Sequence, residues 1–268
     1  MSPKEIMLTH DEIRAAVLAY VRAQPNGSVP MDLKIFGQFE TQGKVVQRAD
    51  RELACQMFYE LALERVIVPG AGPDSVAPGP LSWPSYRLTE YGKQVLGTPE
   101  YQPHDPGGYI KRLRTEIPAV DGTIVRYLEE SLACFQRGTF LASAVMLGCA
   151  AEKAALLLVD VFGGAIQDPP ERQKYEKETK NWMISRKYDA LWKRLEPLAK
   201  GLPKELGDDL HTILDRVFDL IRTTRNEAGH PTGKIVDRDV MTGNLILFPS
   251  YCRRVYCLIE HFSHNPAM

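Results

Sequence analysis

The sequence has no excess of charge of either sign. Its 33 Lys and Arg residues nearly balance 34 Asp and Glu residues, so the formal net charge is −1. A chain without bulk positive charge gains no general attraction to a phosphate backbone. Any nucleic-acid site is therefore expected to be a local basic patch, and the balance argues mildly against a strong DNA binder.

Long uninterrupted apolar runs are also missing, and the N-terminus shows no apolar signal segment. The most apolar stretch, 140–161, contains Glu152, Lys153 and Asp160, which indicates a buried helix and not a membrane span. Cysteine is scarce, and the five scattered residues are read as reduced thiols. These absences favour a cytoplasmic protein without a disulfide framework.

The apolar content is ample for a packed core. Hydrophobic residues make up 44% of the 268 residues and charged residues 25%, which suits one large domain or two smaller ones. The Pro- and Gly-rich segment 98–108 has the composition of a linker. The sequence therefore predicts a mainly α protein with one domain over 1–97 and a second over 109–268.

Helical and strand patterns alternate in the first domain. Thr9 and Glu12 form a capping box at the start of one helix, and Pro25-Asn26-Gly27 ends it. The later elements are predicted as helices over 32–39 and 44–64, strands over 67–69 and 86–88, and a last helix over 89–96.

This order of elements, together with the phrase Tyr-Arg-Leu-Thr-Glu-Tyr-Gly at 86–92, resembles the winged helix-turn-helix fold over about residues 8–97. The start of the predicted helix over 44–64 carries side chains suited to phosphate and base contacts. These side chains are Lys44, Gln47, Arg48 and Arg51. The first 100 residues nevertheless hold 12 acidic and 10 basic residues, so DNA binding and protein contact or dimerisation both stay open.

The second domain reads as helix almost throughout. Helices are predicted over 120–137, 140–162, 182–198, 206–228 and 250–264, with Gly163-Gly164 ending the second of them. That helix is apolar nearly all round, which predicts a central position. The polar segment 167–181 is predicted to be a loop or a solvent-facing excursion.

A strong cation, an amide and an imidazole stand close together at the end of one predicted helix, as Arg225, Asn226 and His230. Pro231 biases His230 out of the helical region. Cleavage of a phosphodiester by an internal 2′-hydroxyl needs a proton acceptor, a proton donor and positive charge near the equatorial oxygens. His and Arg supply these groups near neutral pH, and a two-fold dimer would supply two imidazoles.

Two further residues are supporting candidates, Arg222 one turn before Arg225 and Glu152 on the predicted central helix, where it would contact one of the arginines. The alternatives stay open. Glu152 is equally well explained as a rim acid, and Arg225 as one half of a surface ion pair. His230 alone would suit a helix C-terminus, where the helix dipole favours a cation.

The Arg-Asn-x3-His pattern resembles the Arg-x4-6-His motif of HEPN domains, and the Ala-Ala-Glu-Lys run at 150–153 is similar to that family's central helix. The resemblance covers about residues 109–265. It implies a homodimer whose two motifs line one cleft, and a metal-independent, cofactor-free endoribonuclease of toxin–antitoxin or anti-phage systems acting on RNA. His230 would then be the acid or base, Arg225 would hold the scissile phosphate, and Asn226 would orient one of them.

Some features limit this expectation. One HEPN subgroup has a Tyr two residues after the His, where this chain has Thr232, so regulation through that Tyr is not expected. Other members are inactive and serve as dimerisation modules. The alternative is therefore a winged-helix DNA-binding regulator, or an adaptor that binds an antitoxin or a larger defence complex.

Potential zinc ligands near the C-terminus share one predicted helix, which cannot wrap a tetrahedral ion. These residues are Cys252, Cys257, His261 and His264. No metal site is expected from them.

Overall fold

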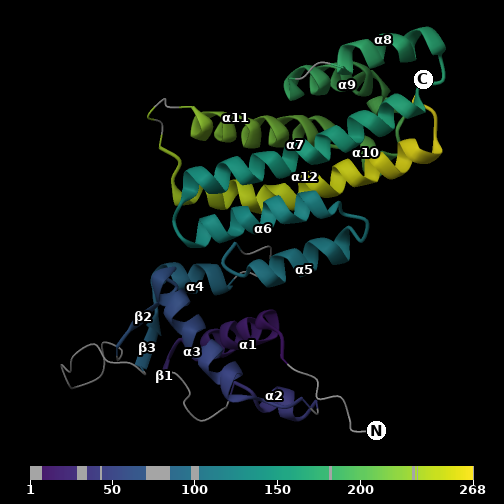
Figure 1. Ribbon diagram of the computed structural model, residues 1–268. Helices are drawn as coiled ribbons and strands as arrows, with labels where there is room; N and C mark the ends of the chain where they lie inside the picture. The colour runs from purple at the N-terminus through teal and green to yellow at the C-terminus, as the bar shows by residue number, and fades with distance from the viewer. Residues whose placement is uncertain are drawn as a thin grey trace. The chain divides into compact units, whose positions relative to one another are not determined.

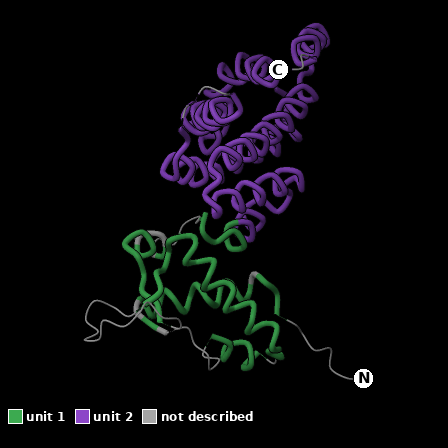
Figure 2. Tube along the Cα trace, turned by 60° about the vertical axis from the view of Figure 1, so that its left-hand side comes forward, with its two compact units in different colours: residues 1–109 green, residues 110–268 purple. Residues whose placement is uncertain are grey.

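The computed structural model describes residues 8–28, 35–42, 44–70, 85–97, 103–180, 183–230, 233 and 235–267. The protein is mainly helical with one small sheet, which confirms the predicted mainly α class. It divides into two compact units, residues 1–109 and 110–268 (Figure 2). No helix in the described part of the chain has the length and apolarity needed to cross a membrane.

Helix α1 (His10–Ala23) begins at the predicted capping box. The Glu12 amide donates to the Thr9 hydroxyl at 3.3 Å, and the Thr9 amide donates to the Glu12 carboxylate at 3.0 Å. Ile13, Val17 and Val21 on its apolar face are fully buried. The local signals at this helix therefore predicted both its start and its buried face.

The other helices of unit 1 are α2 (Gly37–Glu40), α3 (Arg48–Leu63) and α4 (Glu90–Gly97). Helix α2 is later and shorter than the predicted 32–39, of which 32–34 lie outside the described residues. Helix α3 begins at Arg48, later than the predicted Lys44, because Gln47 adopts an extended backbone and closes a capping box with Asp50. Thr89 caps α4 as predicted, accepting from the Gly92 amide at 2.8 Å.

The sheet has the order β1-β3-β2, and β3 pairs antiparallel with both neighbours. Its strands are β1 (Asn26–Ser28), β2 (Ile67–Pro69) and β3 (Ser85–Leu88). Strand β1 was not predicted, because such a short segment after a proline gives no alternating pattern. Gly92 is required beside the sheet, since a Cβ there would lie 2.0 Å from the Val66 carbonyl oxygen. Residues 71–84, between β2 and β3, lie outside the described residues.

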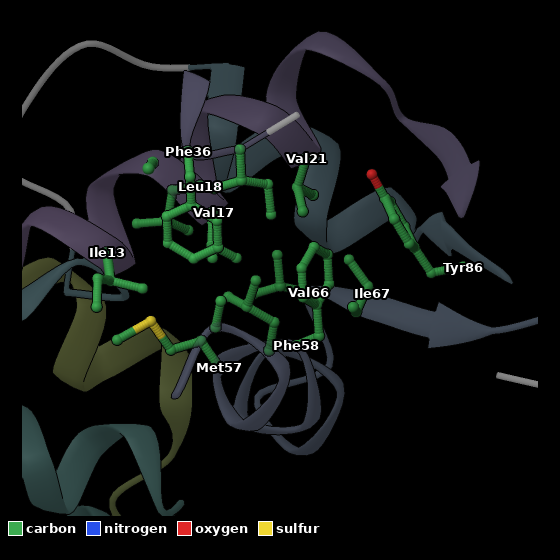
Figure 3. Close-up of a cluster of buried hydrophobic side chains, with 14 of the residues drawn as sticks. Ile13, Val17, Leu18, Val21, Phe36, Met57, Phe58, Val66, Ile67 and Tyr86 are labelled. Atoms are coloured by element: carbon green, nitrogen blue, oxygen red, sulfur yellow. The ribbon is translucent and has the colours of Figure 1, made fainter. Parts of the chain in front are cut away.

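The core of unit 1 gathers around α3 (Figure 3). Met57 and Phe58 of α3 pack with Ile13 and Val17 of α1, and all four are essentially fully buried. The Phe58 ring lies 5.5 Å from that of Tyr86, whose hydroxyl donates to the Gln24 carbonyl at 3.0 Å. Burial of each large apolar side chain stabilises the fold by roughly 1.5–3 kcal/mol.

The predicted linker 98–108 is structured where the structure describes it. His104 is buried, and Arg14 donates to its carbonyl oxygen at 2.7 Å and to Glu64 at 3.0 Å. Helix α5 (Pro106–Glu116), absent from the prediction, begins inside this segment. Asp105 accepts from the Gly108 amide at 3.1 Å, so the proline and glycines belong to a helix start.

Unit 2 is a helical bundle around α7, which packs against α6, α11 and α12 (Figure 1). The predicted central position of this helix is thus confirmed. The helices after α5 are α6 (Gly122–Gln136), α7 (Phe140–Ala165), α8 (Pro169–Thr179), α9 (Ile184–Leu198), α10 (Lys204–Gly207), α11 (Val217–Gly229) and α12 (Arg238–His264). Short 3-10 and π segments, Ala199–Gly201 and His211–Arg216, flank α10.

Two glycines do not end α7, contrary to prediction, and the helix continues to Ala165. A Cβ at Gly163 would lie 2.8 Å from the Tyr175 ring, so the glycine serves the close packing of α8. The polar segment 167–181 is mostly the solvent-facing helix α8, capped by Asp168, which accepts from the Glu171 amide at 3.1 Å.

Two other predictions for unit 2 were wrong in extent. The single helix over 206–228 is interrupted, since Asp209 has a positive φ of 55° and a π turn follows. Helix α12 starts well before the predicted Ser250, because Asp237 caps it by accepting from the Val240 amide at 2.9 Å. The helix then runs through Pro249. Trp182, the predicted start of α9, lies outside the described residues.

Candidate functional site

Arg225 of α11 packs directly against Gly148 of α7. A Cβ at Gly148 of α7 would stand 2.4 Å from Cγ and 2.5 Å from Cβ of Arg225. These atoms are the root of the arginine side chain, which cannot rotate away. The missing side chain at Gly148 therefore allows the approach of α11 and fixes the root of Arg225 on α7.

The Arg225 guanidinium faces an acid one turn further along α7. Its Nε atom is 3.8 Å from Oε1 of Glu152, and its Nη1 donates to the Asn226 amide oxygen at 3.0 Å. The Nε atom is buried and has no hydrogen-bond partner among the described residues. The Arg225 side chain is 36% exposed and that of Glu152 is 11% exposed, so Arg225 extends from a buried carboxylate towards the surface.

Burial dominates the electrostatics of this cluster. Loss of hydration raises the pKa of Glu152 above its ordinary value, although the charges of Arg225 and Arg222 oppose the shift. Burial also raises the pKa of the neighbouring Cys149 thiol, and the Glu152 charge adds to that rise. Burial thus opposes the charged form of Glu152, and the two arginines favour it.

His230 is the C-cap of α11 and leaves the helical region, as its position before Pro231 predicted. Its backbone is extended, with φ −109° and ψ 142°, and its amide donates to the Asn226 carbonyl at 3.1 Å. The residue is exposed, and no contact fixes its ring within the described part of unit 2. An accessible imidazole thus stands one turn beyond Arg225 and Asn226.

Arg222 is placed differently from Arg225. It donates to Asp219 at 2.8 Å in an exposed pair one turn earlier on α11. A surface ion pair, the alternative considered for Arg225, therefore describes Arg222 instead. The structure brings Glu152, Arg225 and Asn226 together, while Arg222 acts on Glu152 only through its charge.

Gly148 and a buried polar pair were missed in the sequence. The Asn244 amide of α12 donates to the Thr224 hydroxyl at 3.1 Å, and both residues are buried. This bond ties α11 to α12 at the residue before Arg225. A lone glycine inside an apolar helix and an asparagine inside an apolar face were the available signals.

The candidate nucleic-acid residues of unit 1 do not form one basic cluster. Lys44 and Gln47 precede α3, where Lys44 pairs with Glu12 and Gln47 caps the helix. Arg48 pairs with Glu52 at 2.9 Å. Of the four candidates, Arg48 and Arg51 alone lie on the first turn of α3, because the helix begins at Arg48 after the Gln47 cap.

The described residues contain no group of three or more His, Cys, Asp or Glu side chains placed to hold a metal ion. All five cysteines are free thiols.

Replacing Glu152 with Gln is expected to stabilise unit 2 at pH 7. The pKa of Glu152 is raised in the folded state, so its ionisation opposes folding as the pH rises above its ordinary value of 4.5. Below that value the carboxyl is protonated in both states, and the advantage of Gln disappears. Urea unfolding at pH 4 and pH 7 measures this, with exposed Glu130→Gln as the control. A Gln variant less stable at pH 7 would show that attraction to Arg225 outweighs burial.

Comparisons with protein-family models, with curated proteins and with solved structures found no match for this chain.

Proposed function

We propose that unit 2 is a HEPN-type endoribonuclease that needs no metal ion, with Arg225, Asn226 and His230 at its site, and that it serves in defence, toxin–antitoxin or stress responses. The observation that carries the proposal is the exposed His230 imidazole one turn beyond Arg225, whose side chain is 36% exposed. Glu152 and Gly148 hold that arginine in place.

The chemistry follows from these groups. The 2′-hydroxyl oxygen of the RNA attacks the adjacent phosphorus, the bond to the 5′-oxygen breaks, and a 2′,3′-cyclic phosphate forms. One imidazole accepts the 2′-hydroxyl proton and another donates a proton to the leaving oxygen. Arg225 stabilises the negative charge on the equatorial oxygens through its planar fork. Because each chain has one such His, a two-fold dimer supplies the acid and the base.

Unit 1 serves in this proposal as a winged-helix targeting or regulatory module. The support is its element order, α1, β1, α2, α3, β2, β3 and a capped α4, with Gly92 packed against the Val66 backbone. Arg48 and Arg51 are exposed on the first turn of α3, which favours the second candidate function, a DNA-binding regulator dimerised through an inactive unit 2. That regulator, or a defence-complex adaptor, would bind its partner and cleave no RNA.

Cleavage is expected to persist when all divalent metal is removed. The purified protein is incubated with tRNA, mRNA and a single-stranded oligonucleotide in excess EDTA, and the ends of the fragments are identified. The expected fragments carry a 2′,3′-cyclic phosphate and a 5′-hydroxyl, because the nucleophile belongs to the RNA. Fragments with a 5′-phosphate, or cleavage that stops in EDTA, would contradict the proposal.

A further inference from the structure

The hairpin of α8 and α9 concentrates positive charge in a chain whose net charge is −1. Residues 169–198, from the start of α8 to the end of α9, contain eight Lys and Arg residues but only five Asp and Glu residues. Most residues of α8 are exposed, and Tyr175 is its only fully buried residue. This segment carries the local basic patch that the neutral total charge made necessary for nucleic-acid binding.

Several acids of the hairpin are already engaged by basic neighbours. The buried Arg194 donates to Glu171 at 2.8 Å and to Glu178 at 2.7 Å. Arg172 lies 3.3 Å from Glu176. Arg194 also lowers the pKa of Glu178 through its hydrogen bond, so this carboxylate stays ionised and neutralised within the hairpin.

Three other cations of the hairpin line a cleft of about 350 Å³ between α8 and α9. Lys177 of α8 and Arg186 and Lys193 of α9 line it, with Glu178 and Asp189 beside them. Arg186 and Lys193 are two turns apart on one face of α9. No hydrogen bond or salt bridge joins the side chains of these three cations to another described residue, and the charge of Lys193 helps to lower the pKa of Glu178.

We propose that this cleft, which we call the α8–α9 cleft, binds the sugar-phosphate backbone of RNA. Three exposed cations spaced along two helices, none of them in a salt bridge with a described residue, fit successive phosphates, which bind Lys and Arg by charge. An apolar protein partner is disfavoured, since none of the exposed large apolar side chains in the described residues belongs to 169–204. The identity of the ligand as RNA rests on the proposed ribonuclease function.

The cleft and the Arg225 site belong to different parts of unit 2. Figure 1 shows α8 and α9 at the end of the bundle opposite the α6–α7 connection. Gly148, which marks the Arg225 site, lies in the first half of α7, and the helix ends near the hairpin at Ala165.

Binding is measured by fluorescence anisotropy of a labelled 30-nucleotide RNA with the full chain carrying His230→Ala, so that no cleavage interferes. The test variant combines Lys177→Gln, Arg186→Gln and Lys193→Gln. We expect its Kd at 0.1 M salt to rise at least about tenfold, and the slope of log K against log salt to fall by about 2, at about 0.7 per lost contact. Asp189→Asn is expected to tighten binding, a gain that misfolding cannot produce.

The matched control removes three exposed cations elsewhere in unit 2. These are Lys111→Gln, Arg114→Gln and Arg126→Gln, which make the same change in net charge. Equal weakening by the control and test variants would overturn the proposal, as would an unchanged Kd in the test variant. Selective binding of acidic vesicles in place of RNA would also overturn it.

The ribonuclease proposal and the cleft proposal can be rejected by different results. RNA binding that depends on the α8–α9 cleft, without cleavage by the wild type, would support the cleft and reject the nuclease. Cleavage that the test variant retains, with unchanged RNA affinity, would support the nuclease and reject the cleft.

Discussion

Replacing His230 with Ala lowers the rate of RNA cleavage by a factor of about 10²–10⁴, the usual contribution of one general acid or base. The loss is larger if the same residue serves as acid in one protomer and base in the other. Thermal stability is expected to stay unchanged, because His230 is exposed and caps α11 through its backbone amide. Single-turnover cleavage of a labelled RNA measures the rate, and circular dichroism checks the fold.

The control for this variant is His264→Ala. His264 is also an exposed histidine in the last turn of a helix, and its ring nitrogen Nδ1 lies 2.9 Å from the Glu260 carbonyl oxygen. Its removal is expected to leave cleavage unchanged. Equal rates for the wild type and the His230 variant would reject the assigned role of this imidazole, whatever the activity of the protein.

Replacing Gly148 with Ala has the largest expected effect on stability among these substitutions. The added Cβ would stand 2.4 Å and 2.5 Å from two Arg225 carbons, so α11 has to shift away from α7. Overpacking of this kind costs about 1–3 kcal/mol, against the about 1 kcal/mol that Ala gains over Gly in a helix. The melting temperature of unit 2 should fall by a few degrees, and cleavage should fall with it because Arg225 moves.

Gly164→Ala on the same helix is the control, because it changes the helix propensity of the residue without crowding a neighbouring helix. No atom lies within 4 Å of a Cβ built at Gly164, so this change is expected to raise stability by up to about 1 kcal/mol. Scanning calorimetry is expected to show a lower melting temperature for Gly148→Ala and a higher one for Gly164→Ala. A Gly148 variant as stable as the Gly164 variant would show that α11 does not press on α7 at Arg225.

Helix starts could be predicted where their signals were local. The Thr9 and Glu12 box is complete within one helical turn, and the structure has it. By contrast, the starts of α5 and α12 depend on Asp105 and Asp237, which were obscured by nearby proline and glycine signals. Strand β1 forms through its pairing with β3, which lies beyond α3 and β2 in the chain. Its own residues therefore carry no local pattern that predicts a strand.

Some residues of the candidate site could be predicted from local sequence, and others could not. Arg225, Asn226 and His230 lie together on the last turns of one helix and its cap, and they could be selected from the sequence alone. The partner of Arg225 was foreseen in Glu152 because a buried acid usually has a cation beside it. Gly148 could not be assigned a role, because the reason for that glycine is an atom contact with Arg225, which is distant in the sequence.

The buried Arg14 has a consequence for the timing of synthesis. Its guanidinium donates one hydrogen bond to the Glu64 carboxylate and another to the carbonyl oxygen of His104, which comes much later in the chain. At about 5–20 residues per second, the ribosome makes His104 about 2–8 s after Glu64. During that interval α1 and α3 can already pair through Arg14 and Glu64, but the guanidinium still lacks its last acceptor. Unit 1 therefore completes its polar interior only after the chain has passed α4.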